Sequence, residues 1–156
     1  MMAQDKAYIA ANYPLPAYNY RVTIDGIVVS FAEVSGLNVE YEPVIYKHGL
    51  SYLMGNKIIP GMCQPIKLSM KKGLVKNADY LQQWIDKTYT DPFYSHAKRD
   101  IVIDLCDEKG DTVIRWKVQR ALPTQLEAPT FDANSNEVAI ESMTFVAHGL
   151  EVNYSP

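Results

Sequence analysis

The sequence predicts one mainly β domain, an antiparallel β-sandwich or barrel with a single flanking α-helix. Apolar and polar residues alternate with a period of two in several segments, which is typical of half-buried strands. Asp25-Gly26 separates two such segments and is typical of a tight hairpin turn. Helical spacing of apolar residues occurs convincingly only within residues 77–90. We therefore expect residues 17–156 to form one domain, preceded by an N-terminal arm of residues 1–16.

Composition narrows the functional classes. Lys and Arg total 15 and Asp and Glu total 18, which gives a net charge of -3. A nucleic-acid-binding domain usually has a basic excess instead. No apolar run approaches the ~20 residues needed to cross a membrane, and the first residues lack the apolar core of a secretory signal. We expect no membrane insertion by this chain and folding in the cytoplasm.

The N-terminal third contains a series of expected strands. Pro14 and Pro16 keep the end of the N-terminal arm extended. Alternation predicts a strand over residues 18–24 and a return strand over 27–31. Ser35-Gly36 then predicts a bulge or bend. A third extended run covers residues 37–42, where the following Pro43 weakens a central strand.

Residues 44–64 form a long apolar segment with no persistent period. Loops beyond ~12–15 residues are uncommon and usually functional or disordered. This segment is too apolar for ready disorder. Two interpretations remain open: the segment folds back over its own core, or it forms a surface for a partner.

The second half continues the β pattern. Alternation predicts a strand over residues 66–71, and the helix follows, with Asn77 as its N-cap. Residues 101–106 and 112–118 predict two strands joined by a polar turn. Pro123 and Pro129 are expected to interrupt the next stretch, and a last long strand is expected over residues 137–147.

The sequence matches no complete motif for catalysis, cofactor binding or metal binding. Cys63 and Cys106 have no metal-ligand spacing, and His48, His96 and His148 are widely separated. Ser35 lacks the first glycine of a nucleophile elbow. We predict no catalytic residue, no cofactor site, no metal site and no enzymatic activity.

Residues 132–136 resemble the start of a calcium loop, but the pattern then breaks. Glu137 stands where the loop needs glycine, and Met143 stands where it needs a bidentate glutamate. A polar turn is the expected structure here.

Two charged faces are predicted from the strand alternation. Lys67 and Lys71 share one face of their strand, and Glu40 and Glu42 share one face of theirs. If those two strands pair, cross-strand ion pairs follow. Such a wet face suits either the outside of a monomer or the wall of a water-filled channel.

Several stretches resemble one known family in their order and spacing. They are residues 20–26 running into 31–37, residues 46–49 with Pro60-Gly61, residues 66–73 with 81–84, and residues 136–141 through 148–150. The sequence resembles the tail tube proteins of contractile phages and of extracellular contractile injection systems, over most of its length.

This resemblance implies six subunits in a ring, with a continuous β-barrel lumen, and rings stacked into an inner tube. The implied partners are other copies of the chain, a sheath protein, and baseplate or spike proteins, with a protein effector or DNA in the lumen. The implied particle is a phage tail or a phage-tail-like machine that is released from the cell. The expected lumen-facing residues are Glu40, Glu42, Lys67 and Lys71. The expected interface residues are Tyr8, Tyr13, Leu50, Tyr52, Leu53, Met54, Ile58 and Ile59.

Two alternatives stay open from the sequence. Within the family, the chain is a specialised copy, either a baseplate-proximal tube initiator or a tail terminator. In a different class, it is a monomeric β-sandwich binding module.

Overall fold

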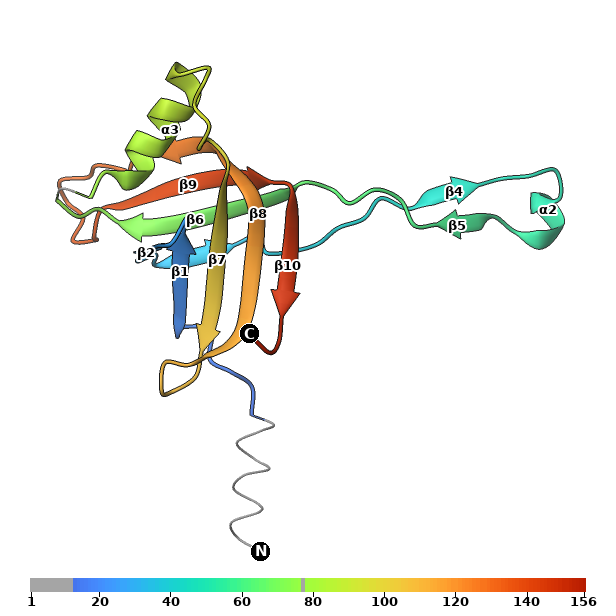
Figure 1. Ribbon diagram of the computed structural model, residues 1–156, viewed down its shortest axis with the longest axis horizontal. Coiled ribbons are helices and arrows are strands. Elements are labelled where there is room, and N and C mark those ends of the chain that lie inside the picture. The colour runs from blue at the N-terminus through green and yellow to red at the C-terminus, as the bar shows by residue number, and fades with distance from the viewer. Residues whose placement is uncertain (1–12, 77) are drawn as a thin grey trace, which may run out of the picture.

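The fold is a mainly antiparallel β structure with one long helix against it and a two-stranded hairpin projecting from it (Figure 1). The computed structural model describes residues 13–76 and 78–156. The main sheet has the strand order β2-β1-β7-β8-β9-β6-β3, and β10 also pairs with β8. The strands are β1 (Tyr20–Ile24), β2 (Ile27–Val29), β3 (Glu33–Ser35), β4 (Val44–Tyr46), β5 (Lys57–Ile59), β6 (Ile66–Gly73), β7 (Arg99–Cys106), β8 (Thr112–Glu127), β9 (Ile140–Ala147) and β10 (Gly149–Asn153). The helices are α2 (Ser51–Met54) and α3 (Tyr80–Thr90).

Strand β8 joins two halves of the sheet. Its first part pairs with β7 and β10, and its second part pairs with β9. Between them, Arg120 has φ 53, a left-handed conformation uncommon outside glycine. The Arg120 amide donates to the Asp100 carboxylate at 2.9 Å, which supports this bend. In Figure 1 the strands of the two halves run across each other and enclose the core.

The prediction that Pro123 interrupts the chain is wrong, because β8 continues to Glu127. The register with β9 shifts between Pro123 and Gln125, so the missing proline N–H falls at an irregularity. The last expected strand forms as β9, which begins at Ile140 and ends, as predicted, at Ala147. A further strand that was not predicted, β10, begins after His148.

The core lies between the two halves of the sheet and α3. Its buried apolar residues are Val22, Ile24, Ile66, Leu68, Met70, Leu81, Trp84, Ile101, Ile103, Val118, Ala121, Met143, Phe145 and Ala147. Trp84 anchors the helix: its ring centroid lies 5.2 Å from that of Phe145, and its indole N–H donates to the Ala97 carbonyl at 2.8 Å. The predicted mainly β fold with a flanking helix is confirmed.

The helix begins differently from the prediction. Asp79 occupies the N-cap position and makes no side-chain capping hydrogen bond. The expected cap, Asn77, lies outside the described residues.

The first hairpin follows the prediction, whereas the third expected strand does not form. Asp25 and Gly26 have φ 49 and 81, as a primed turn requires. Residues 37–41 are not a strand; Tyr41 makes only an isolated bridge to Cys63. Gly36, at φ 91, lies against β6, because a Cβ built there would lie 2.1 Å from the Lys67 carbonyl oxygen. The residues after it stay beside the segment that leads into β6, where the Gln64 amide donates to the Glu40 carbonyl at 2.7 Å, but they form no continuous ladder. The partner of β6 is therefore the short strand β3.

Candidate assembly surfaces

The projecting hairpin, defined as residues 44–62, is an apolar arm in which none of the described side chains is buried. Strands β4 and β5 pair through three residues each, and α2 lies near the tip (Figure 1). Leu53, Met54 and Ile58 are 69%, 73% and 74% exposed. The interpretation in which this segment covers its own core is wrong, because the segment extends away from the sandwich instead.

At the base of the hairpin, the outgoing and the returning segments of the chain are in close contact. The Glu42 amide donates to the Met62 carbonyl at 3.1 Å, and the Gln64 amide donates to the Glu40 carbonyl at 2.7 Å. A Cβ built at Gly61 would lie 1.6 Å from the Glu42 carbonyl oxygen. Glycine is therefore needed for this approach, which fixes how the arm leaves the sandwich.

Most of the predicted interface residues lie on this hairpin. Leu50, Leu53, Met54, Ile58 and Ile59 are all exposed there. Further exposed apolar residues that the sequence prediction omitted are Val44, Ile45, Tyr46 and Met62.

The tyrosines predicted at the interface are separate from this cluster. Tyr13 is exposed in the segment that precedes β1. Tyr8 lies outside the described residues, and so does the side chain of Tyr52.

The four predicted lumen residues fall into two groups. Glu40, Glu42 and Lys67 line one shallow hollow at the base of the hairpin, where Glu42 accepts a hydrogen bond from Gln64 at 3.0 Å. Lys71 lies further along β6 and forms an ion pair of 3.6 Å with Glu33. The cross-strand ion pair thus joins β6 to β3, because residues 37–41 form no strand beside it.

The outer surface of β3, β6 and β9, which we call the β6 face, is mostly polar. On β6 and β9 its side chains alternate with a buried row. The β6 face consists of Glu33, Ser35, Lys67, Ser69, Lys71, Ser142, Thr144 and Val146. Lys72 points the other way: it is buried and lies 3.5 Å from the Glu141 carboxylate.

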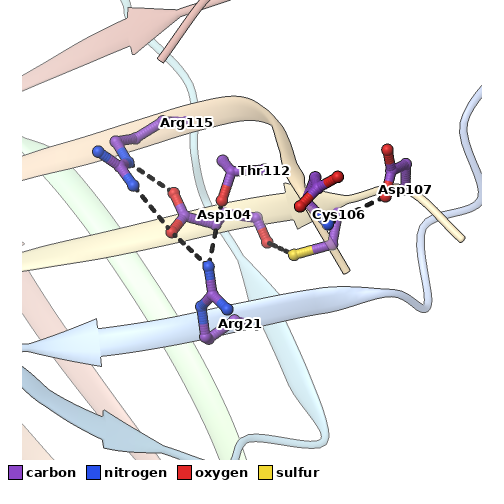
Figure 2. A network of polar contacts seen from close by, with 7 residues as sticks. Arg21, Asp104, Cys106, Asp107, Thr112 and Arg115 are labelled. Carbon is purple, nitrogen blue, oxygen red and sulfur yellow. Dashed lines mark hydrogen bonds and ion pairs between the residues drawn. The ribbon is translucent and has the colours of Figure 1, made fainter. Parts of the chain in front are cut away.

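The outer surface of β1 and β7 carries a charge cluster (Figure 2). The buried Asp104 carboxylate accepts hydrogen bonds from Arg115 at 2.7 and 3.2 Å and lies 3.5 Å from Arg21. These residues are direct neighbours in the strand register. The hydrogen bond from Arg115 to Asp104, and then the charge of Asp104, raise the pKa of Arg115 above its usual value. The cluster is a structural ion pair that ties three strands together.

The described residues show little that suits chemistry on a small molecule. Among them, no group of histidine, cysteine, aspartate and glutamate is placed to hold a metal ion. The Asp132 carboxylate accepts from the Asn134 amide at 3.0 Å, which confirms the expected polar turn. No helix in the described part of the chain is long and apolar enough to span a membrane.

Comparison with known families identifies the family of this chain. A family model described as "T4-like virus tail tube protein gp19" matches residues 16–151. This chain belongs to the T4-like tail tube protein family. The match covers the hairpin and all of the sandwich except the end of β10, and it confirms the resemblance seen in the sequence. No curated protein matches this tail tube protein.

Two solved structures similar to this tail tube protein are a contractile injection system and the cap of the anti-feeding prophage. One is the PVC sheath-tube complex of an extracellular contractile injection system in the extended state, with 30% identity and TM-score 0.85, covering 95% of this chain and 97% of that chain. Another is the tube terminating cap of the anti-feeding prophage, with 30% identity and TM-score 0.82, covering 92% and 93%. Hcp1 from Flavobacterium johnsoniae shares the fold at 13% identity and TM-score 0.54, covering 88% of this chain and 97% of that chain. The chain is thus a tail tube protein of the contractile injection type.

Proposed function

We propose that this tail tube protein assembles into hexameric rings that stack to form the inner tube of a contractile particle. The observation that carries the proposal is the projecting hairpin, whose described apolar side chains are all exposed. Burying one such side chain is worth about 1.5–3 kcal/mol, so several together favour a protein contact strongly. A monomeric binding module would have no evident use for an arm that lacks any buried face.

The proposed partners follow from the similar structures and from the surfaces. The most similar chains described above come from a sheath-tube complex and a tube cap, and a less similar one comes from a baseplate. We assign the hairpin and Tyr13, together with Tyr8 and Tyr52, to contacts between copies of the chain. The sheath would surround the rings, and a baseplate with its spike would carry them.

The β6 face is our candidate for the lumen wall. Its hydroxyls, most of them partly exposed, and its Lys67 and Lys71 side chains suit a water-filled channel. Glu40 and Glu42 lie at its hairpin end. The cargo of such a lumen is a protein effector or DNA. The role is mechanical, a conduit that needs no covalent chemistry, in a particle assembled in the cytoplasm and then released.

A second function is favoured by one observation. The sheath/tube terminator of the same PVC system is similar at 29% identity and TM-score 0.81, close to the values for the sheath-tube complex. A terminator, or an initiator next to the baseplate, would form rings that end or begin a tube. Such a ring would not stack on itself.

Deletion of residues 50–59 tests the proposal. We expect the shortened chain to remain folded, because the deleted residues contribute none of the core, and to lose assembly. Circular dichroism and thermal unfolding report the fold, while a sizing column and negative-stain electron microscopy report rings and tubes.

Phe93→Ser is the matched control, because Phe93 is 91% exposed but lies outside the hairpin. This variant should form tubes like the unmodified chain. Stacked tubes from the deletion variant, or an unmodified chain that stays monomeric when seeded with baseplates, would disprove the proposal. Single rings that never stack would favour the terminator.

A further inference from the structure

A second exposed apolar cluster lies far from the hairpin, and we call it the far patch. It consists of Leu74, Val75, Phe131, Val138 and Ile140, of which Phe131 is 84% and Val138 is 73% exposed. The Leu74 amide donates to the Ala139 carbonyl at 2.9 Å, so two loops distant in sequence form one surface. Phe131, Val138 and Ile140 also line a shallow hollow in the 129–140 loop.

The far patch and the hairpin lie at opposite ends of the same strand. The hairpin leads into the start of β6, where Ile66 pairs with Ala147. The far patch begins directly after the end of β6, where Gly73 pairs with Ile140. Eight residues of strand separate the two by roughly 26 Å. Because the hairpin extends away from the far patch, it cannot reach the patch of its own chain (Figure 1).

The charges of the two regions are complementary. Lys47 and Lys57 lie in the hairpin, and residues 44–62 contain no aspartate or glutamate. Asp132 and Glu137 line the hollow of the far patch, and residues 128–139 contain no lysine or arginine. A basic apolar arm and an acidic apolar hollow are therefore presented by the same chain.

We propose that the hairpin of one copy docks on the far patch of the next copy, with Lys47 and Lys57 facing Asp132 and Glu137. The contact joins two different surfaces, so each pair of copies still presents one free hairpin and one free patch. Such a heterologous contact either closes into a ring or continues as an open assembly. Because the two surfaces lie at opposite ends of the molecule, the contact suits end-to-end stacking of successive rings. The inference rests on the proposed tube function and adds the surface that receives the hairpin.

Charge reversal on each side, separately and together, tests the pairing. We expect Asp132→Lys/Glu137→Lys and Lys47→Glu/Lys57→Glu each to raise the concentration needed for tube growth roughly tenfold or more, because like charges then meet. Mixing the two variants should restore growth as alternating copies. Sedimentation and electron microscopy measure tube mass and length. Glu108→Lys/Asp111→Lys is the matched control, since it makes the same charge change in the exposed turn between β7 and β8.

A crosslink gives a second measurement that does not depend on tube growth. In a Cys63→Ser background, Leu53→Cys and Val138→Cys variants are mixed under mild oxidation, since Leu53 and Val138 are exposed on the hairpin and the far patch. A disulfide joining the two different variants is expected. Tubes that tolerate both charge reversals, or crosslinks that form only between identical variants, would overturn this inference alone. An unmodified chain that never assembles would overturn the proposed function itself.

Discussion

The sandwich and the hairpin are built from similar apolar residues, but only the sandwich buries them. In the sandwich, Ile66, Leu68 and Met70 alternate with outward-facing residues and are at most 1% exposed. In the hairpin, Ile45 and Ile58 are directly paired and yet 59% and 74% exposed. Apolar content alone therefore does not indicate a core. What distinguishes the two regions is whether another layer covers the strand.

This difference has a thermodynamic consequence. A strand such as β6 has neighbours on both edges, and the sandwich interior covers one face. A two-stranded hairpin alone is marginally stable in water. We therefore expect the sandwich to carry the stability of the chain and the hairpin to gain its stability from a second copy.

The largest effect should come from Trp84→Ala. Trp84 is 1% exposed and packs on Phe145, with the Arg99 guanidinium 4.9 Å from its ring centroid. Removing such a side chain should lower the free energy of unfolding by about 3–5 kcal/mol. Urea unfolding of the monomer, followed by circular dichroism, measures the change.

Leu53→Ala is the matched hairpin variant, because Leu53 is 69% exposed. It should change the free energy of unfolding of the monomer by less than about 0.5 kcal/mol. Equal losses in the two variants would contradict the division between sandwich and hairpin.

The sequence was sufficient for strands that have one buried face. Strands β1, β6 and β7 were predicted because alternation directly reflects burial on one side. Residues 37–41 alternate too, but Tyr41 makes only an isolated bridge to Cys63, and alternation cannot report whether a neighbouring strand completes the ladder. The hairpin strands were missed for the opposite reason: with no buried face, β4 and β5 have no period to detect.

The candidate surfaces divide in the same way. Composition alone singled out the tip of the hairpin, since its apolar residues are close in sequence. The far patch was not predicted, because only the pairing of β6 with β9 brings Leu74 beside Ala139. The charge cluster was not predicted either, because three separate strands supply Arg21, Asp104 and Arg115.

Asp104→Asn should have the second largest effect on the free energy of unfolding. It tests whether the charge cluster on the outer surface of the sandwich stabilises the fold. The substitution keeps the size of the side chain but leaves Arg21 and Arg115 close together without the buried carboxylate between them. Because both guanidinium groups are partly exposed and hydrated, we expect a loss of about 1–3 kcal/mol. Urea unfolding measures it.

Lys57→Gln in the hairpin is the control for removing one charge. It should change the free energy of unfolding of the monomer by less than about 0.5 kcal/mol. If Asp104→Asn were equally neutral, the charge cluster would contribute nothing to the joining of β1, β7 and β8.

Tyr20→Phe should have the smallest effect, and its pH dependence identifies the cause. The Tyr20 hydroxyl donates to the Phe31 carbonyl at 2.7 Å, so its loss should cost about 0.5–1.5 kcal/mol at neutral pH. Burial, and then the Glu33 carboxylate, raise the pKa of Tyr20 above 10.0. The folded chain therefore holds the phenol proton more tightly than the unfolded chain, and this contribution to stability is complete below about pH 10.

As the pH rises through the raised pKa of Tyr20, the unmodified chain loses a contribution that the phenylalanine variant never had. The difference in the free energy of unfolding between the two proteins should therefore shrink above about pH 10. Comparing the two at each pH cancels the titration of the other tyrosines and lysines. Tyr46→Phe in the exposed hairpin should change the free energy of unfolding by less than about 0.5 kcal/mol at neutral pH. The contrary result is a difference in the free energy of unfolding that stays constant from about pH 8 to about pH 11, on either side of the ordinary tyrosine pKa. It would show that the Tyr20 hydroxyl acts only through packing. This edge of the sandwich would then be as open to water as the hairpin.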